Sequence, residues 1–315
     1  MAATFAEAGS DPGFFSYNHC PFWVMSLSGA ASCQRPVASF VRQIASSIGV
    51  SGVSLKPSSE AVTVPQSYPP EILRREAADG GADVVVVCEH GSNIIPPEFG
   101  DLGLDPAARQ SHIAWDPGAL GVAHEMRRLL DADLVAGSVS RLLYDCNRPP
   151  EAPSAMPDMS EIFEIPGNRN LTERDRERRV TAIYKPFYAA LKDTLDARGE
   201  GCIITVHSFT PVFKGVQRLC EIGILHDADT RLADAMLAAA PSDFPFKLER
   251  NVPYSASDGV THTLKEHGLA RGWPNVMIEI RNDLIGTPSQ QSDMARHLVA
   301  LFSAAGSSLE APIKT

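Results

Sequence analysis

The sequence has no long apolar run and comparatively few basic residues. A membrane-spanning helix needs about 18 consecutive apolar residues, and no stretch of the 315 residues approaches that length. The chain has 28 Lys and Arg residues against 38 Asp and Glu residues, which gives a formal net charge of −10. This charge opposes the phosphate neutralisation that sequence-independent nucleic-acid binding requires. We therefore expect a protein with no membrane-spanning segment and no nucleic-acid partner.

Closely spaced cysteines and a secretory signal are also missing. The six cysteines show no CxxC spacing, as is typical of a reduced cytoplasmic chain. Residues 1–62 are rich in Ser, Ala and Gly, and their apolar patch at 22–25 has no basic region before it, which argues against a secretory signal. The scarcity of acidic residues there leaves an organelle transit peptide as an alternative. We expect residues 1–62 to be a poorly ordered extension and residues 63–315 to form a single α/β domain.

Buried strands and amphipathic helices alternate after residue 70. The apolar runs at 82–88, 202–206 and 275–280 are short, β-branched and bounded by turn residues, which predicts central strands. A helix is predicted from Thr172 to about residue 196, because apolar residues recur every four positions behind an N-cap. The pattern indicates a three-layer α/β fold with a mostly parallel mixed sheet and helices on both faces.

The remaining elements are weaker signals. Residues 151–170 are irregular and predict a long surface loop, which in compact domains is usually functional or disordered. Further helices are predicted at 118–130, 231–239, 259–267 and 289–305, further strands at 133–139 and 221–225, and a short apolar run follows at 142–144.

Polar residues lie where three of the predicted strands end. His90 and His207 follow two of them, and Glu279 lies near the end of the third. Ligand sites in open α/β sheets form beyond the carboxyl ends of the strands. Two histidines and a carboxylate are the ingredients of a catalytic zinc site with an open position for water. The simpler interpretation of each histidine is a hydrogen-bonded structural residue.

Asn147 and Arg148 form a second polar group, after the run at 142–144. The planar guanidinium of an arginine can bind a carboxylate through two hydrogen bonds, and an asparagine amide can donate a third. This pair therefore indicates a pocket for a carboxylate ligand. The alternative is a salt bridge between Arg148 and Asp145. Pairing with nearby acids is likewise the simpler explanation for Arg141 and Arg281.

Five strings in the chain resemble the N-formylglutamate amidohydrolase family. They are CEHGSN at 88–93, HIAWDPGA at 112–119, SRLLYDCNRP at 140–149, TVHSFTP at 205–211 and IEIRNDLI at 278–285. The resemblance covers about residues 83–305. The order His, Asn-Arg, His, Glu is also similar to that of zinc carboxypeptidases and aspartoacylases, and it implies their phosphorylase/hydrolase-like architecture.

The resemblance implies one Zn²⁺ ion held by His90 and His207, with Glu279 as general base and Asn147 with Arg148 as the clamp for the substrate carboxylate. Zinc carboxypeptidases have a glutamate three residues after the first histidine, but this chain has Asn93 there, a poor zinc ligand.

The third ligand therefore has to come from elsewhere in the chain. Asp116, within HIAWDPGA, is our candidate. Its alternative role is to cap the helix that begins near Gly118.

Three further residues are candidates for contact with the substrate. Arg141 and Arg281 could stabilise a developing oxyanion or hold a second carboxylate. Tyr254 could place a phenol over the site, although a tyrosine in a loop is more often a packing residue.

The sequence thus predicts a cytoplasmic, metal-dependent amidohydrolase that cleaves a small N-acyl amino acid such as N-formylglutamate. The main alternative is a non-catalytic protein that binds a carboxylate ligand. A hydrolase with Ser208 or Cys88 as nucleophile is less favoured, because no GxSxG motif surrounds Ser208.

Overall fold

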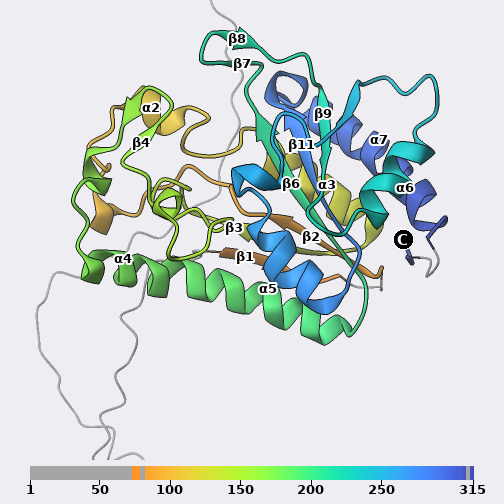
Figure 1. Cartoon of the computed structure of the whole chain (residues 1–315), viewed down its shortest axis with the longest axis horizontal. Coiled ribbons are helices and arrows are strands. Elements are labelled where there is room, and N and C mark those ends of the chain that lie inside the picture. The colour runs from red at the N-terminus through yellow and green to blue at the C-terminus, as the bar shows by residue number, and fades with distance from the viewer. Residues whose placement is uncertain (1–72, 79–81, 310–312) are drawn as a thin grey trace, which may run out of the picture. The chain divides into compact units, whose positions relative to one another are not determined.

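The computed structural model describes residues 73–78, 82–309 and 313–315 (Figure 1). All of them belong to one compact unit, Val64–Thr315. The predicted extension at 1–62 lies outside the described residues. Within them, no helix is long and apolar enough to cross a membrane.

A mixed sheet of seven strands forms the centre of the described region. Its order is β1-β3-β2-β6-β11-β9-β10. Neighbours from β3 to β11 are parallel, as are β9 and β10, whereas β1 pairs antiparallel with β3 and β9 pairs antiparallel with β11. The prediction of a mostly parallel mixed sheet is confirmed. The strands are β1 (Leu73–Glu76), β2 (Val84–Cys88), β3 (Asp133–Gly137), β6 (Cys202–Phe209), β9 (Ile222–Leu225), β10 (Leu248–Arg250) and β11 (Asn275–Arg281).

Helices cover both faces of the sheet, because successive residues of a buried strand point to opposite sides. Val84 and Val86 of β2 pack into the core that also holds helices α3 (Ala119–Leu130), α6 (Arg231–Ala239) and α7 (Pro288–Gly306). Val85 and Val87 face the other core, beneath helix α5 (Lys185–Arg198). These three layers are the predicted architecture.

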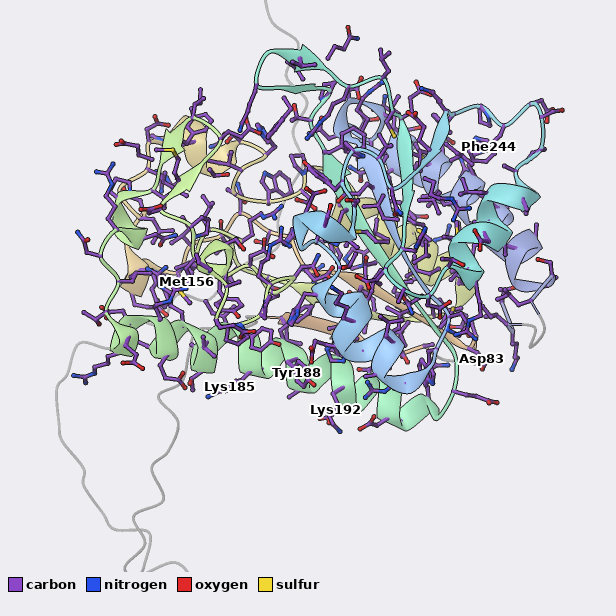
Figure 2. All side chains as sticks on the ribbon, viewed as in Figure 1. Asp83, Met156, Lys185, Tyr188, Lys192 and Phe244 are labelled. Atoms are coloured by element: carbon purple, nitrogen blue, oxygen red, sulfur yellow. The ribbon has the colours of Figure 1, made fainter. Side chains whose placement is uncertain are left out.

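The predicted helix after Thr172 is present and runs through three consecutive segments. Helix α4 (Glu173–Arg179) continues through a wider helical turn, Val180–Tyr184, into α5, and together they form the long green helix of Figure 1. Thr172 and Asp175 cap its start reciprocally. Lys185 and Lys192 lie on its outer, exposed face (Figure 2).

Two of the weaker sequence signals differ in detail from the structure. The short apolar run at 142–144 is not part of a strand: residues 142 and 143 lie in a turn, in which Leu143 N–H bonds to the Ser140 carbonyl, and all three side chains are buried in the core. The helix predicted at 259–267 is present but starts and ends later: residues 259–261 are turns, and a continuous helical stretch runs from residue 262 through Leu264–Gly268 and Leu269–Arg271.

The irregular segments of the chain add two small β-hairpins. The loop at 151–170 contains β4 (Met159–Ser160) and β5 (Phe163–Glu164). The second hairpin, β7 (Val212–Phe213) with β8 (Val216–Gln217), follows β6 directly. The short helix α2 (Pro106–Gln110) completes the described α-helices.

Candidate active site

Three neighbouring strands bring the predicted chemical residues together. His90 lies two residues beyond the end of β2, His207 lies within β6, which runs on to Phe209, and Glu279 of β11 is the direct register partner of His207. All three are buried, with exposed fractions of 2 %, 2 % and 5 %. The parallel register thus places both histidines and the glutamate at one edge of the sheet.

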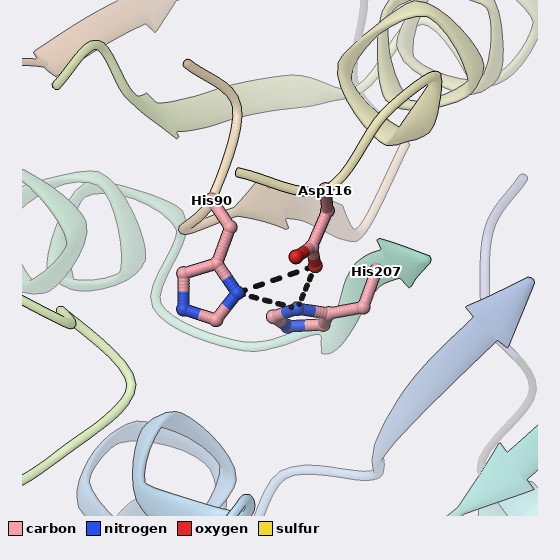
Figure 3. A group of neighbouring side chains, drawn as sticks. All are labelled: His90, Asp116 and His207. Carbon is pink, nitrogen blue, oxygen red and sulfur yellow. Dashed lines mark hydrogen bonds and ion pairs between the residues drawn. The ribbon is translucent and has the colours of Figure 1, made fainter. Parts of the chain in front are cut away.

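Asp116 joins the two histidines from the segment before α3 (Figure 3). Its Oδ2 atom lies 3.2 Å from His90 Nδ1 and 2.9 Å from His207 Nδ1, and the two Nδ1 atoms lie 3.2 Å apart. Two ring nitrogens and one carboxylate oxygen therefore point at a common centre. The side chain of Asp116 does not cap α3, whose N-cap is Gly118, so the capping alternative is not observed.

The spacing of these three atoms fits a small cation. Ligands about 2.0–2.1 Å from a tetrahedral zinc ion lie roughly 3.3 Å from one another, close to the separations seen here. Among the described residues, His90, Asp116 and His207 form the group that could hold a metal ion. Asn93 takes no part in this group; its amide donates to the Arg109 carbonyl at 3.1 Å.

Each histidine also has a second carboxylate behind it. Asp145 Oδ1 lies 2.7 Å from His90 Nε2, and Glu89 Oε2 lies 3.1 Å from His207 Nε2. A carboxylate on the far ring nitrogen fixes the tautomer and orientation of a metal-binding histidine. Asp145 makes a hydrogen bond of this kind, whereas Glu89 and His207 form an ion pair without hydrogen-bond geometry. Sequence reasoning missed both acids. Both acids are close in sequence to residues that were predicted for the site: Glu89 precedes His90, and Asp145 lies in the string that holds Asn147.

Arg141 ties the acidic side chains together. Its guanidinium lies 3.2 Å from Asp116 Oδ1 and 2.7 Å from Asp145 Oδ2. Burial alone would raise the pKa of Asp145, but Arg141 and His90 hold that pKa well below its usual value. Burial raises the pKa of Glu279 to about 7, and Glu279 Oε2 has no hydrogen-bond partner among the described residues.

The two members of the predicted carboxylate clamp have different surroundings. Asn147 is 1 % exposed, and its amide donates to the Val260 carbonyl at 2.5 Å and accepts from Thr263 N–H at 3.0 Å. Its polar atoms thus hold the segment at 260–263. Arg148 instead lines a pocket next to the histidine cluster, and its guanidinium donates to the Asn147 carbonyl at 2.8 Å.

The pocket has a volume of ≈ 310 Å³ and reaches Asp116. Arg141, Arg148 and Tyr254 line it, together with Ser208. Arg281 is not among the lining residues; it pairs with Glu221 and Asp283. Four of the predicted site residues therefore lie around one pocket, namely Asp116, Arg141, Arg148 and Tyr254. Arg281 points away from it.

Neither proposed nucleophile of the alternative hydrolase is set up for attack. Ser208 Oγ donates to the Pro117 carbonyl at 2.8 Å. Cys88 is fully buried, and this burial raises the pKa of its thiol well above the usual value, so the thiolate that would attack is disfavoured.

Residues 82–286 match the family model of N-formylglutamate amidohydrolase, about two thirds of the chain. The chain belongs to this family. It is accordingly an enzyme that hydrolyses an amide bond in a small molecule, and the non-catalytic alternative is not supported. The resemblance seen in the five sequence strings is confirmed.

Two solved structures are similar to this member of the N-formylglutamate amidohydrolase family. A gene product of Agrobacterium tumefaciens is 49 % identical, with a TM-score of 0.74 over 76 % of this chain and 96 % of that one. The N-formylglutamate amidohydrolase of Ralstonia eutropha JMP134 is 20 % identical, with a TM-score of 0.54 over 73 % and 95 %, and supports the fold. No curated protein sequence matches the chain.

Proposed function

We propose that the protein is a metal-dependent amidohydrolase that cleaves N-acyl amino acids such as N-formylglutamate. The convergence of His90 Nδ1, His207 Nδ1 and Asp116 Oδ2 within 3.2 Å of one another carries this proposal. These three residues would hold one divalent metal ion, which we take to be zinc from the mixture of nitrogen and oxygen donors. Bound there, zinc would supply Lewis-acid activation of water and of the amide carbonyl.

Glu279 is the general base in this proposal. It lies beside His207 on the adjacent strand and is buried, and no described residue forms a hydrogen bond with its Oε2 atom. Oε2 would take a proton from the attacking water and then give it to the amide nitrogen as that bond breaks. For N-formylglutamate the products are formate and glutamate, and all atoms of water and substrate are accounted for.

Arg148 binds the carboxylate of the substrate. It lines the pocket, whereas Arg141, the other arginine there, already holds Asp116 and Asp145. A fixed carboxylate holds the scissile carbonyl in one place relative to Glu279. Asn147 has a structural role in this proposal, because its side chain anchors the segment at 260–263 through two hydrogen bonds.

Metal analysis of purified protein tests the proposal. We expect about one zinc ion per chain in the wild type and loss of the metal in His90→Ala and His207→Ala. His124→Ala is the matched control, because this histidine lies on α3 and pairs with Glu76. Hydrolysis of N-formylglutamate should follow the metal content. A wild type that binds no zinc, or that keeps full turnover after chelation, would contradict the proposal.

A further inference from the structure

Arg218 lies among three aromatic rings beside the pocket. Its guanidinium is 4.4 Å from the ring centre of Phe213, 5.0 Å from that of Tyr254 and 5.5 Å from that of Phe209. Arginine stacks well on aromatic faces because its charge is spread over a flat group. The side chain thus joins the end of β6 and hairpin β7–β8, which are consecutive along the chain, to the loop that holds Tyr254, 36 residues after Arg218.

The three rings belong to the pocket wall. Phe209, Phe213 and Tyr254 all line the pocket, but Arg218 itself does not. Arg218 N–H also bonds to the Pro211 carbonyl at 2.8 Å, which closes the loop around hairpin β7–β8. Arg218 therefore supports the wall from outside.

No acidic side chain among the described residues forms an ion pair with Arg218. The guanidinium instead donates from Nη2 to Tyr254 Oη at 3.1 Å and from Nη1 to the Thr210 carbonyl at 3.4 Å. Both acceptors lie on residues that line the pocket. The polar contacts of this arginine are thus directed to the wall.

The hydrogen bond to Tyr254 fixes the direction of the phenol. A guanidinium can only donate, so the Tyr254 oxygen must accept from Arg218. The hydroxyl proton of Tyr254 then has to point away from Arg218 and is available to another acceptor. Since Tyr254 lines the pocket, an oxygen of a bound substrate can be that acceptor.

We propose that Arg218 is a positioning residue that orients the phenol of Tyr254 as a hydrogen-bond donor to the substrate. This inference rests on the proposed function, because it assigns a role within the same pocket. Tyr254 makes the contact with the substrate. Arg218 acts only through Tyr254 and through the rings of the wall.

A double-mutant cycle tests this coupling through kcat and KM for N-formylglutamate. We expect Arg218→Met and Tyr254→Phe each to lower kcat/KM roughly tenfold, because each removes the oriented donor. The double variant should be no worse than Tyr254→Phe, since the arginine then has no phenol to orient. Arg218→Lys should restore little, because an ammonium lacks the flat fork that stacks on the rings.

Arg178→Met is the matched control. Arg178 also lies over an aromatic ring, 5.3 Å from the centre of Phe99, but on helix α4 away from the pocket lining. It should leave kcat and KM unchanged. Additive losses in the double variant would overturn the proposal, because Arg218 would then act on the substrate by a separate route.

A second measurement does not depend on turnover. Protein labelled with 3-fluorotyrosine gives a ¹⁹F signal for Tyr254, assigned by its loss in Tyr254→Phe. We expect this signal to move in Arg218→Met and Arg218→Lys but not in Arg178→Met. An unchanged signal would overturn the proposal. If the wild type fails to hydrolyse N-formylglutamate while the signal moves, the proposed function fails and the positioning by Arg218 stands.

Discussion

Buried charges are arranged differently at the two ends of the sheet. At the amino end, Asp133 at the start of β3 forms an ion pair with Arg198 at the end of α5, at 2.6 Å. Arg198 also donates to the Ala82 carbonyl, and Asp133 accepts from Ala78 N–H. At the carboxyl end, six ionisable side chains are packed together, each at most 5 % exposed: Glu89, His90, Asp116, Asp145, His207 and Glu279.

The difference indicates what each group of charges does. The pair at the amino end joins a strand, a helix and a loop through the hydrogen bonds of Asp133 and Arg198. The cluster at the carboxyl end concentrates three donor atoms on one centre, and Glu279 Oε2 has no hydrogen-bond partner in the part of the chain that the structure describes. Burial of this many charges costs free energy unless each is paired. The cluster is therefore better explained by chemistry than by stability.

The largest contrast should come from Glu279→Gln, which keeps the size of the side chain but cannot accept a proton. We expect kcat for N-formylglutamate to fall about 10²- to 10⁴-fold while KM changes little. Steady-state kinetics at saturating zinc measures this. A variant with normal kcat would show that another group takes the proton.

A smaller effect, on zinc affinity, is expected at Asp145, which contacts the proposed metal ligand His90. Asp145→Asn removes the negative charge of the carboxylate that contacts His90 Nε2 and the Arg141 guanidinium. Zinc affinity should fall about 10- to 100-fold, as is usual when such supporting carboxylates are changed. Competition with a chelator measures the affinity. Unchanged affinity would mean that His90 is oriented without Asp145.

The smallest effect on activity should come from the amino end. Asp133→Asn weakens the pair with Arg198, and we expect a loss of about 1–3 kcal/mol in the free energy of unfolding. Urea denaturation measures that loss. At temperatures where the variant stays folded, kcat and KM should equal those of the wild type. A change in either would show that the two ends of the sheet are coupled.

Local patterns in the sequence were enough for most of the scaffold. The β-branched runs identified β2, β6 and β11, and the capped four-residue periodicity identified the helix after Thr172. Secondary structure was harder to predict where an apolar run is buried by contacts with distant parts of the chain. The run at 142–144 is buried by packing in the core and not by strand pairing, and local periodicity cannot separate the two.

The site was only partly accessible from the sequence. His90, His207 and Glu279 could be nominated because each lies near the end of a buried strand, and parallel pairing brings such ends together. Asn147 and Arg281 were nominated by the same reasoning, yet their polar atoms are engaged by Val260 with Thr263 and by Glu221 with Asp283.

The chain itself thus specifies the residue types and the strands that carry them, because strand and helix formation depends largely on near neighbours. The partners depend on the tertiary structure. Asp116 to His207, Asp145 to His90, and Arg218 to Tyr254 are separated by 91, 55 and 36 residues along the chain. Side-chain contacts over such separations are set by the packing of the whole sheet and its loops, which no local pattern contains.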